Sequence, residues 1–266
     1  MSAATTERNT QDPGAVRPSA VRDVLAVWNR QARPLVRNPL AVVFGMAQPL
    51  LYLALFAPLL TGLGGPEGQD PWQWFVPGLL VMLALFTCGF AGFGLLPEIA
   101  SGAHERMLAT PASRTSLLLG RVVQDVALML VQSVLVLLLV LPLGFRAPLP
   151  ETVLGLALLA VLGAVLATLS YVVALATRQT YVFAPVLQTV VMPLMLLSGV
   201  LLPMDLAPGW LYTLSRLNPL AHVVDAERAL FAGQWGTDVA VGWVVALVLL
   251  VLSLVLGARM MRRGAS

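Results

Sequence analysis

Charge-free apolar stretches long enough to cross a lipid bilayer constrain the fold of this chain more than any other feature of its sequence. No charged residue occurs between Arg37 and Glu67, and the stretch from Trp72 to Pro97 is also free of charge. A transmembrane helix needs about 20 predominantly apolar residues. Hydrophobic residues make up 58% of the chain and charged residues 11%, which excludes a water-soluble domain of this size. The chain is therefore predicted to be an integral membrane protein.

Six such stretches are predicted to be transmembrane helices of one domain covering residues 39–258. They lie at residues 39–60, 72–97, 126–145, 152–177, 180–203 and 239–258. Pro49 and Pro58 are expected to kink the first span, and neighbouring helices can satisfy the backbone groups that such kinks release. The predicted fold class is thus an all-α membrane protein, and an even number of spans places both termini on one side.

The segment before the first span divides into two parts. Residues 1–18 are polar, lack an apolar period and lack the apolar core of a secretory signal, so they are interpreted as a disordered cytoplasmic tail. Residues 19–36 carry apolar and basic side chains on opposite sides of a helical pattern. They are predicted to form an amphipathic connecting helix that binds anionic lipids and grips a partner protein beside the first span. The residues assigned to these contacts are Arg22, Trp28, Arg30 and Arg33.

Two longer polar segments lie between the spans. Residues 98–125 predict a short helix, a break at Pro111 and a second helix after Ser113. Residues 205–238 predict two short amphipathic helices separated by an Asn-Pro pair. We expect these two helices to dip into the membrane as a re-entrant hairpin that the spans shield from lipid.

Asp225 and Arg228 lie three residues apart on the second helix of that hairpin. Opposite charges at this spacing are neighbours on a helix surface. They are interpreted as a structural ion pair in preference to a contact with cargo. The hairpin as a whole is expected to form the exit side of a gate.

Arginine is unevenly distributed between the two sides of the predicted bundle. Thirteen of the 16 arginines fall on the side of the termini, whereas Arg146, Arg216 and Arg228 fall on the other. Because basic residues concentrate in cytoplasmic loops, the termini and residues 98–125 are predicted to be cytoplasmic. Residues 205–238 are then expected on the outer side.

The sequence offers no pattern that could supply energy for transport. All 16 basic residues are arginine, which excludes a phosphate-binding P-loop because that loop requires a lysine. The acidic residues are assigned to tails, loops and span edges, whereas ion-coupled transporters usually hold an ionisable group near the midplane. The polar residues expected within the spans are neutral: Gln48, Thr87, Gln132, Ser133, Ser170 and Gln188. Active transport would therefore draw its free energy from a separate ATPase.

Cofactor chemistry is not expected in this chain. Cys88 is the only cysteine, and His104 and His222 are the only histidines, so the sequence has neither a disulfide framework nor a multi-histidine metal centre. An intramembrane lipid-processing enzyme with a Ser198 nucleophile, a His222 base and Asp225 is an alternative. Ser198 lacks a GxSxG context, however. No catalytic, cofactor-binding or metal-ligating residue is assigned.

The residues alone leave two interpretations of the segment 98–125. It is either a hydrated connector or a coupling helix that lies in a groove of the ATPase. In the second case its charged residues make the polar contacts: Glu98, Glu105, Arg106 and Arg114.

Three stretches carry a resemblance to a known family. They are Arg37–Pro39; Glu98, Gly102, Glu105–Leu108 and Pro111; and Leu197–Val200 with Pro203, Trp210, Asn218, Pro219, Asp225 and Arg228. In these positions the chain resembles the permease subunits of type 2 ABC transporters, particularly the daunorubicin-resistance-like exporters. Family members often carry more charge where this chain has Ala103 and His104, so partner contacts at those two positions stay open.

The resemblance implies a location, partners and roles. The expected location is the bacterial plasma (inner) membrane. Two permease subunits, identical or closely related, would bind two ATP-binding subunits that hold ATP and magnesium, and neither cofactor would bind this chain. The residues implied to contact the ATP-binding subunit are Glu98, Gly102, Glu105, Arg106, Leu108, Pro111 and Arg114. The residues implied to form the outer gate are Ser198, Gly199, Pro203, Trp210, Asn218, Pro219, Asp225 and Arg228.

The expected cargo is a hydrophobic or amphipathic compound such as a drug, an antibiotic or a lipid. Its predicted walls are apolar and aromatic: Phe44, Phe75, Phe86, Phe90, Phe93 and Met192. A polysaccharide or glycolipid exporter of the same architecture is the alternative, and nucleic acid is not an expected partner.

Overall fold

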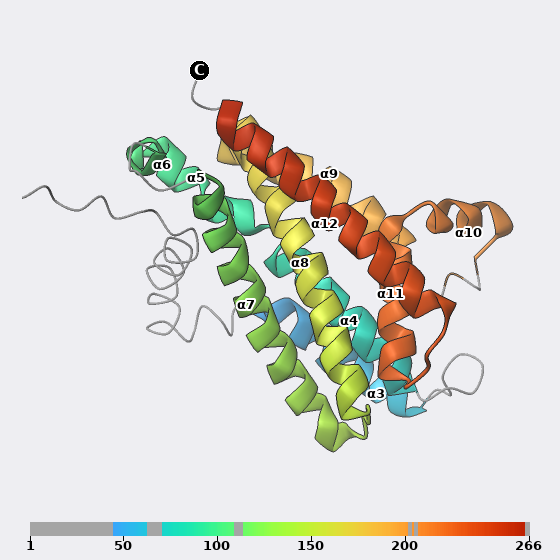
Figure 1. Ribbon diagram of the computed structural model, residues 1–266. Coiled ribbons are helices and arrows are strands. Elements are labelled where there is room, and N and C mark those ends of the chain that lie inside the picture. Colours follow the sequence, from blue (N-terminus) through green and yellow to red (C-terminus); the bar gives the residue numbers. More distant parts are fainter. Residues whose placement is uncertain (1–44, 63–70, 109–113, 202–203, 205–206, 264–266) are drawn as a thin grey trace, which may run out of the picture.

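The computed structural model describes residues 45–62, 71–108, 114–201, 204 and 207–263. Within these ranges the regular structure is entirely helical (Figure 1). Five segments are long and apolar enough to cross a membrane: Pro71–Ala100, Thr115–Leu143, Leu149–Thr177, Thr180–Leu197 and Thr237–Met261. The predicted fold class, an all-α membrane protein, is confirmed.

The first predicted span is described only in part. Its described portion is α3 (Ala47–Gly62), and the apolar stretch within it, Ala47–Phe56, is shorter than a span. The expected start of this span, the tail 1–18 and the connecting helix 19–36 lie outside the described residues. A total of six spans therefore stays a prediction.

The second predicted span is a broken helix. It consists of α4 (Pro71–Thr87), the short 3-10 helix η2 (Ala91–Gly94) and α5 (Leu96–Ala100). At the break, the Gly92 amide donates to Ser170 Oγ of the fourth span at 2.9 Å. A Cβ atom at Gly92 would lie 2.6 Å from the Ser170 carbonyl oxygen. The neighbouring helix thus provides a hydrogen-bond partner for a backbone amide at the break in the helix.

The third span begins earlier than its charges suggest. α7 (Arg114–Val140) is one continuous helix, followed by the 3-10 turn η3 (Leu141–Leu143). Residues 114–125, predicted to belong to the cytoplasmic connection, are therefore helical and continuous with the span. Arg121 and Asp125 interrupt the apolar run of the sequence, but both have partners on neighbouring elements, so the helix passes through them.

α8 lies at the centre of the bundle. This helix, Leu149–Thr177, contacts α4 and α7 as well as three later helices. Those helices are α9 (Thr180–Leu197), α11 (Pro219–Phe231) and α12 (Thr237–Arg263). Figure 1 shows α7, α8 and α12 side by side, with α3 and α4 behind them. On α4, residues 75–85 are buried without interruption, so this broken span forms much of the core.

The two helices of the predicted outer hairpin have different surroundings. α10 (Gly209–Arg216) projects from the bundle, whereas α11 packs between α4, α8 and α12 (Figure 1). Gly242 of α12 makes one of these contacts close, because a Cβ atom there would lie 2.3 Å from Ala226 Cβ. The chain enters the hairpin through Gly199, whose φ of +76° is a left-handed conformation that glycine adopts without strain.

Apolar side chains cover the outward faces of α7, α9 and α12. Val134, Val190 and Val248 are 41%, 52% and 53% exposed. A lipid environment accommodates such faces, whereas water would not.

Candidate functional site

Two short helices and the first turns of α7 form the described part of the predicted coupling segment, residues 98–125. α5 is followed by α6 (Ala103–Leu108), and the chain turns between them at Gly102, which has a φ of +68°. A residue with a side chain would be strained in this left-handed conformation. Both helices lie at the end of the bundle where α12 ends (Figure 1). The segment is therefore a compact projection beside the last turns of α12.

Glu98 of α5 points toward the bundle and forms an ion pair with Arg121 of α7. Two hydrogen bonds join the side chains, Arg121 Nη2 to Glu98 Oε2 and Arg121 Nη1 to Glu98 Oε1, the second at 3.3 Å. The Arg121 side chain is 8% exposed and that of Glu98 32%. Glu98 thus has an internal partner on α7, and its contact with a partner protein stays a prediction.

Asp125 continues this polar contact one turn along α7. The hydroxyl of Tyr171 on α8 donates to Asp125 Oδ2. Asp125 lies within the continuous apolar segment Thr115–Leu143, directly before the residues 126–145 that were predicted as the span. Together Glu98, Arg121, Asp125 and Tyr171, which we call the polar bridge, connect α5 with α7 and α8.

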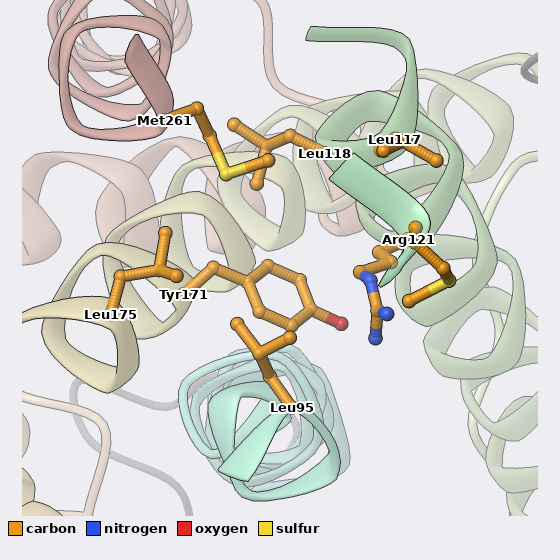
Figure 2. A pocket seen from close by; sticks show the side chains of 8 residues that line it. Leu95, Leu117, Leu118, Arg121, Tyr171, Leu175 and Met261 are labelled. Carbon is orange, nitrogen blue, oxygen red and sulfur yellow. The ribbon is translucent and has the colours of Figure 1, made fainter. Parts of the chain in front are cut away.

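Apolar side chains from several helices surround the polar bridge. Figure 2 shows the Tyr171 ring between Leu95 and Leu118, with Arg121 beyond its hydroxyl. Met107 of α6 and Met261 of α12 line the same space, a cavity of about 10 Å³. This volume is about that of one water probe. The site is therefore a junction between the coupling segment and the spans, too small to hold cargo.

The remaining predicted coupling residues are placed as follows. Arg106 is exposed, and its Nη1 donates to the Ser101 carbonyl at 3.4 Å. Glu105 and Leu108 lie in α6, and Arg114 is the first residue of α7. Pro111 and the connecting-helix residues Arg22, Trp28, Arg30 and Arg33 are outside the described residues.

At the opposite end of the bundle, Arg228 of α11 contacts two other segments of the chain. Its Nη2 donates to the Gly199 carbonyl at 2.7 Å, and its Nε donates to the Trp74 carbonyl at 3.3 Å. The guanidinium also lies 4.5 Å from the centroid of the Trp74 ring, a cation–π geometry. Arg228 therefore links α11 to α4 and to the end of α9.

The predicted ion pair between Asp225 and Arg228 is wrong. Asp225 pairs instead with Arg216 of α10, with Nη1 and Oδ2 2.7 Å apart. The helical spacing was compatible with a pair, but Arg228 contacts the Trp74 ring and the carbonyls of Trp74 and Gly199. Asp225 thus joins the two helices of the hairpin.

Asn218 and Pro219 set the start of α11. Asn218 Oδ1 accepts from the Leu220 amide at 3.0 Å, and Nδ2 donates to the Leu194 carbonyl of α9 at 2.7 Å. Asparagine at the N-cap followed by proline at the first helical position is a favoured helix start. Trp210 on α10 is 71% exposed, and Pro203 is outside the described residues.

Four of the predicted outer-gate residues line one small pocket. It has a volume of about 40 Å³ and is mainly polar. The residues that line it are Ser198, Gly199, Met204, Tyr212, Ser215, Arg216, Ala221, Asp225 and Arg228. The pocket therefore lies between the hairpin and the residues that directly follow α9.

The alternative hydrolase arrangement finds no support in these contacts. Ser198 Oγ donates to the Met195 carbonyl at 2.7 Å, and His222 Nε2 lies 3.1 Å from the Arg216 carbonyl oxygen. Each side chain thus has a local partner in place of the other.

Arg121, Asp125 and Tyr171 are absent from the site residues assigned from sequence. A signal existed for the first two, because charges four residues apart within an apolar helix share one face and each needs a polar partner. Tyr171 lies in an apolar run and gives no such signal.

Comparisons with known proteins agree with this architecture. The family model described as ABC-2 type transporter matches residues 22–232. The daunorubicin resistance ABC transporter permease protein DrrB1 of Streptomyces coeruleorubidus is 25% identical over 237 residues, which cover 88% of this chain and 82% of that protein. Nodulation protein J of Rhizobium leguminosarum bv. viciae is 25% identical over 256 residues, covering 94% of this chain and 97% of that protein.

Proposed function

Since this chain belongs to the ABC-2 type transporter family, we propose that it is the permease subunit of an exporter driven by ATP. A separate ABC subunit binds ATP and magnesium, and a second permease copy or a close homologue completes the membrane part. The sequence contains no lysine, so it has no P-loop of its own. The polar bridge is the observation that carries the proposal, since it joins the coupling segment to two spans.

The polar bridge transmits movement of α5 and α6 to the membrane-spanning helices. When the ATP-binding subunits close, they displace these helices. Glu98 is hydrogen-bonded to Arg121, and Asp125 to Tyr171, so α7 and α8 follow the displacement. α7 has 27 residues and is about 40 Å long, enough to carry the movement across the bilayer.

The outer hairpin responds at the far end of the spans. Arg228 holds α11 to Trp74 and Gly199, and Asp225 holds it to α10. We assign these contacts to the closed state of an exit gate. Movement of the spans separates them and opens a route to the outer leaflet.

A row of aromatic rings suits a hydrophobic or amphipathic cargo such as a drug, an antibiotic or a lipid. Phe86, Phe90 and Phe93 stack with successive centroid separations of 6.0 Å, and Phe93 meets Phe183 of α9 edge-on at 4.8 Å. Phe93 is 37% exposed. Of the other predicted wall residues, Met192 is 43% and Phe75 5% exposed, so Phe75 belongs to the core.

The proposed partner contact is tested with Glu105→Arg. The variant reverses a charge on α6, so it is expected to fold and insert normally but to lose co-purification with the ATP-binding subunit. Asp238→Arg is the matched control, because Asp238 is exposed in the first turn of α12, far from α6. Equal co-purification of Glu105→Arg and wild type would remove α6 from the partner interface.

A further inference from the structure

Glu227 is a buried acid that the proposed gate does not use. Its side chain projects from α11 and has no exposed surface. Neither carboxyl oxygen has a hydrogen-bond partner among the described residues. The polar bridge and the contacts of Arg228 leave this group unexplained.

Gly155 of α8 provides the space that the Glu227 carboxyl occupies. A Cβ atom at Gly155 would lie 2.9 Å from Glu227 Oε2 and 2.8 Å from Cε2 of Phe231. Phe231 in turn contacts Phe145, with the ring centroids 5.9 Å apart. The carboxyl is therefore enclosed by a glycine backbone and aromatic carbon, which cannot solvate a negative charge.

The charged groups on the surrounding elements are engaged elsewhere. α4 and α9 contain no charged residue. On α8, Glu151 Oε1 accepts a hydrogen bond from Trp235 Nε1 at 3.2 Å, whereas Glu151 Oε2 has no hydrogen-bond partner among the described residues. The other titratable groups at this end are the paired Arg216 and Asp225, Arg228 on Trp74 and Gly199, His222 on the Arg216 carbonyl, and the exposed Arg146 and Asp238.

An ionised carboxylate without a partner is too costly in such surroundings, so the neutral acid is the favoured form. Burial accordingly raises the pKa of Glu227 well above its usual range. We propose that Glu227 is a proton-binding site that couples protonation to the packing of α11 against α8. The carboxylic acid keeps its proton while the two helices are packed, and it releases the proton to water when α11 moves away.

This inference rests on the proposed function in one respect only: that the separation of α11 from α8 opens the gate. The direction of the pH dependence follows from the difference between the packed and the separated state of the two helices. The pKa of Glu227 is higher in the packed state than in the separated state, so acid stabilises packing and rising pH weakens it. Acid on the outer side should therefore hold the gate closed.

The test uses the full chain in lipid nanodiscs, without cargo or nucleotide. Wild type is expected to show the infrared C=O band of a protonated carboxylic acid at neutral pH, and Glu227→Gln is expected to lose it. The thermal unfolding midpoint of wild type should fall from mildly acidic to mildly alkaline pH, and Glu227→Gln should lose this dependence.

Glu151→Gln is the matched control, since it makes the same chemical change on the facing helix and should keep both the band and the pH dependence. If Glu227→Gln does not fold, Glu227→Leu replaces the acid with an apolar side chain for the same measurements. A band or pH dependence unchanged in the Glu227 variants would overturn the proposal. Neither measurement requires transport, so failure of the proposal on Glu227 is distinguishable from failure of the proposed function.

Discussion

At the scale of single residues, the polar bridge shows how charge is held within an apolar helix. Arg121 and Asp125 lie one turn apart on α7, and each has a partner on a different element. Breaking one member of such a set leaves the others desolvated without compensation. The bridge therefore constrains where α5 and α8 sit relative to α7.

Tyr171→Phe tests the last contact of the bridge. The change keeps the ring but removes the hydroxyl that donates to Asp125, so the free energy of unfolding should fall by about 1–3 kcal/mol. Thermal unfolding of the purified chain in detergent measures the loss. Tyr181→Phe is the control, because Tyr181 is 75% exposed. Equal stability of the two variants would show that the hydroxyl contributes nothing.

At the scale of elements, the sequence predicted the helices better than their joints. Long apolar runs specify a spanning helix whatever their detailed packing, and the five described spans follow them. The break after Thr87 could not be predicted, since it depends on Ser170 of a distant helix meeting the Gly92 amide. Asp225 and Arg228 were likewise assigned by helical spacing, while their partners lie on other elements.

The same limit applies to the hairpin. Its two short helices and the break at Asn218 were readable from local capping signals, and the structure has both helices. The burial of α11 was not readable, because it arises from contacts with α4, α8 and α12. These contacts are also the reason why Glu227 is fully buried.

Gly242→Ala tests the close approach of α11 and α12. The new methyl group would lie 2.3 Å from Ala226 Cβ and 2.8 Å from the His222 carbonyl oxygen. The helices must shift apart, at a cost of about 1–3 kcal/mol. Gly236→Ala is the matched control, since a Cβ atom there has no neighbour within 4 Å. Thermal unfolding midpoints compare the two, and a Gly242→Ala protein as stable as its control would contradict this packing.

At the scale of the whole molecule, the two ends of the bundle have different structures. One end carries the coupling segment and the polar bridge, and the other carries the hairpin held by Arg228. The helices between them present valine and leucine to lipid. Such a chain is suited to transmit movement, and its family supplies the expected source of that movement in a separate ATP-binding subunit.

The central claim, that energy enters from this partner through α5, is tested most directly by one measurement. Cargo transport and ATP hydrolysis are recorded together in vesicles that hold the permease with its ATP-binding subunit. Arg121→Ala should retain ATP hydrolysis but lose transport per ATP consumed, because α5 is no longer joined to α7. An unchanged ratio in Arg121→Ala, or pumping by the wild-type chain without the partner, would contradict the account.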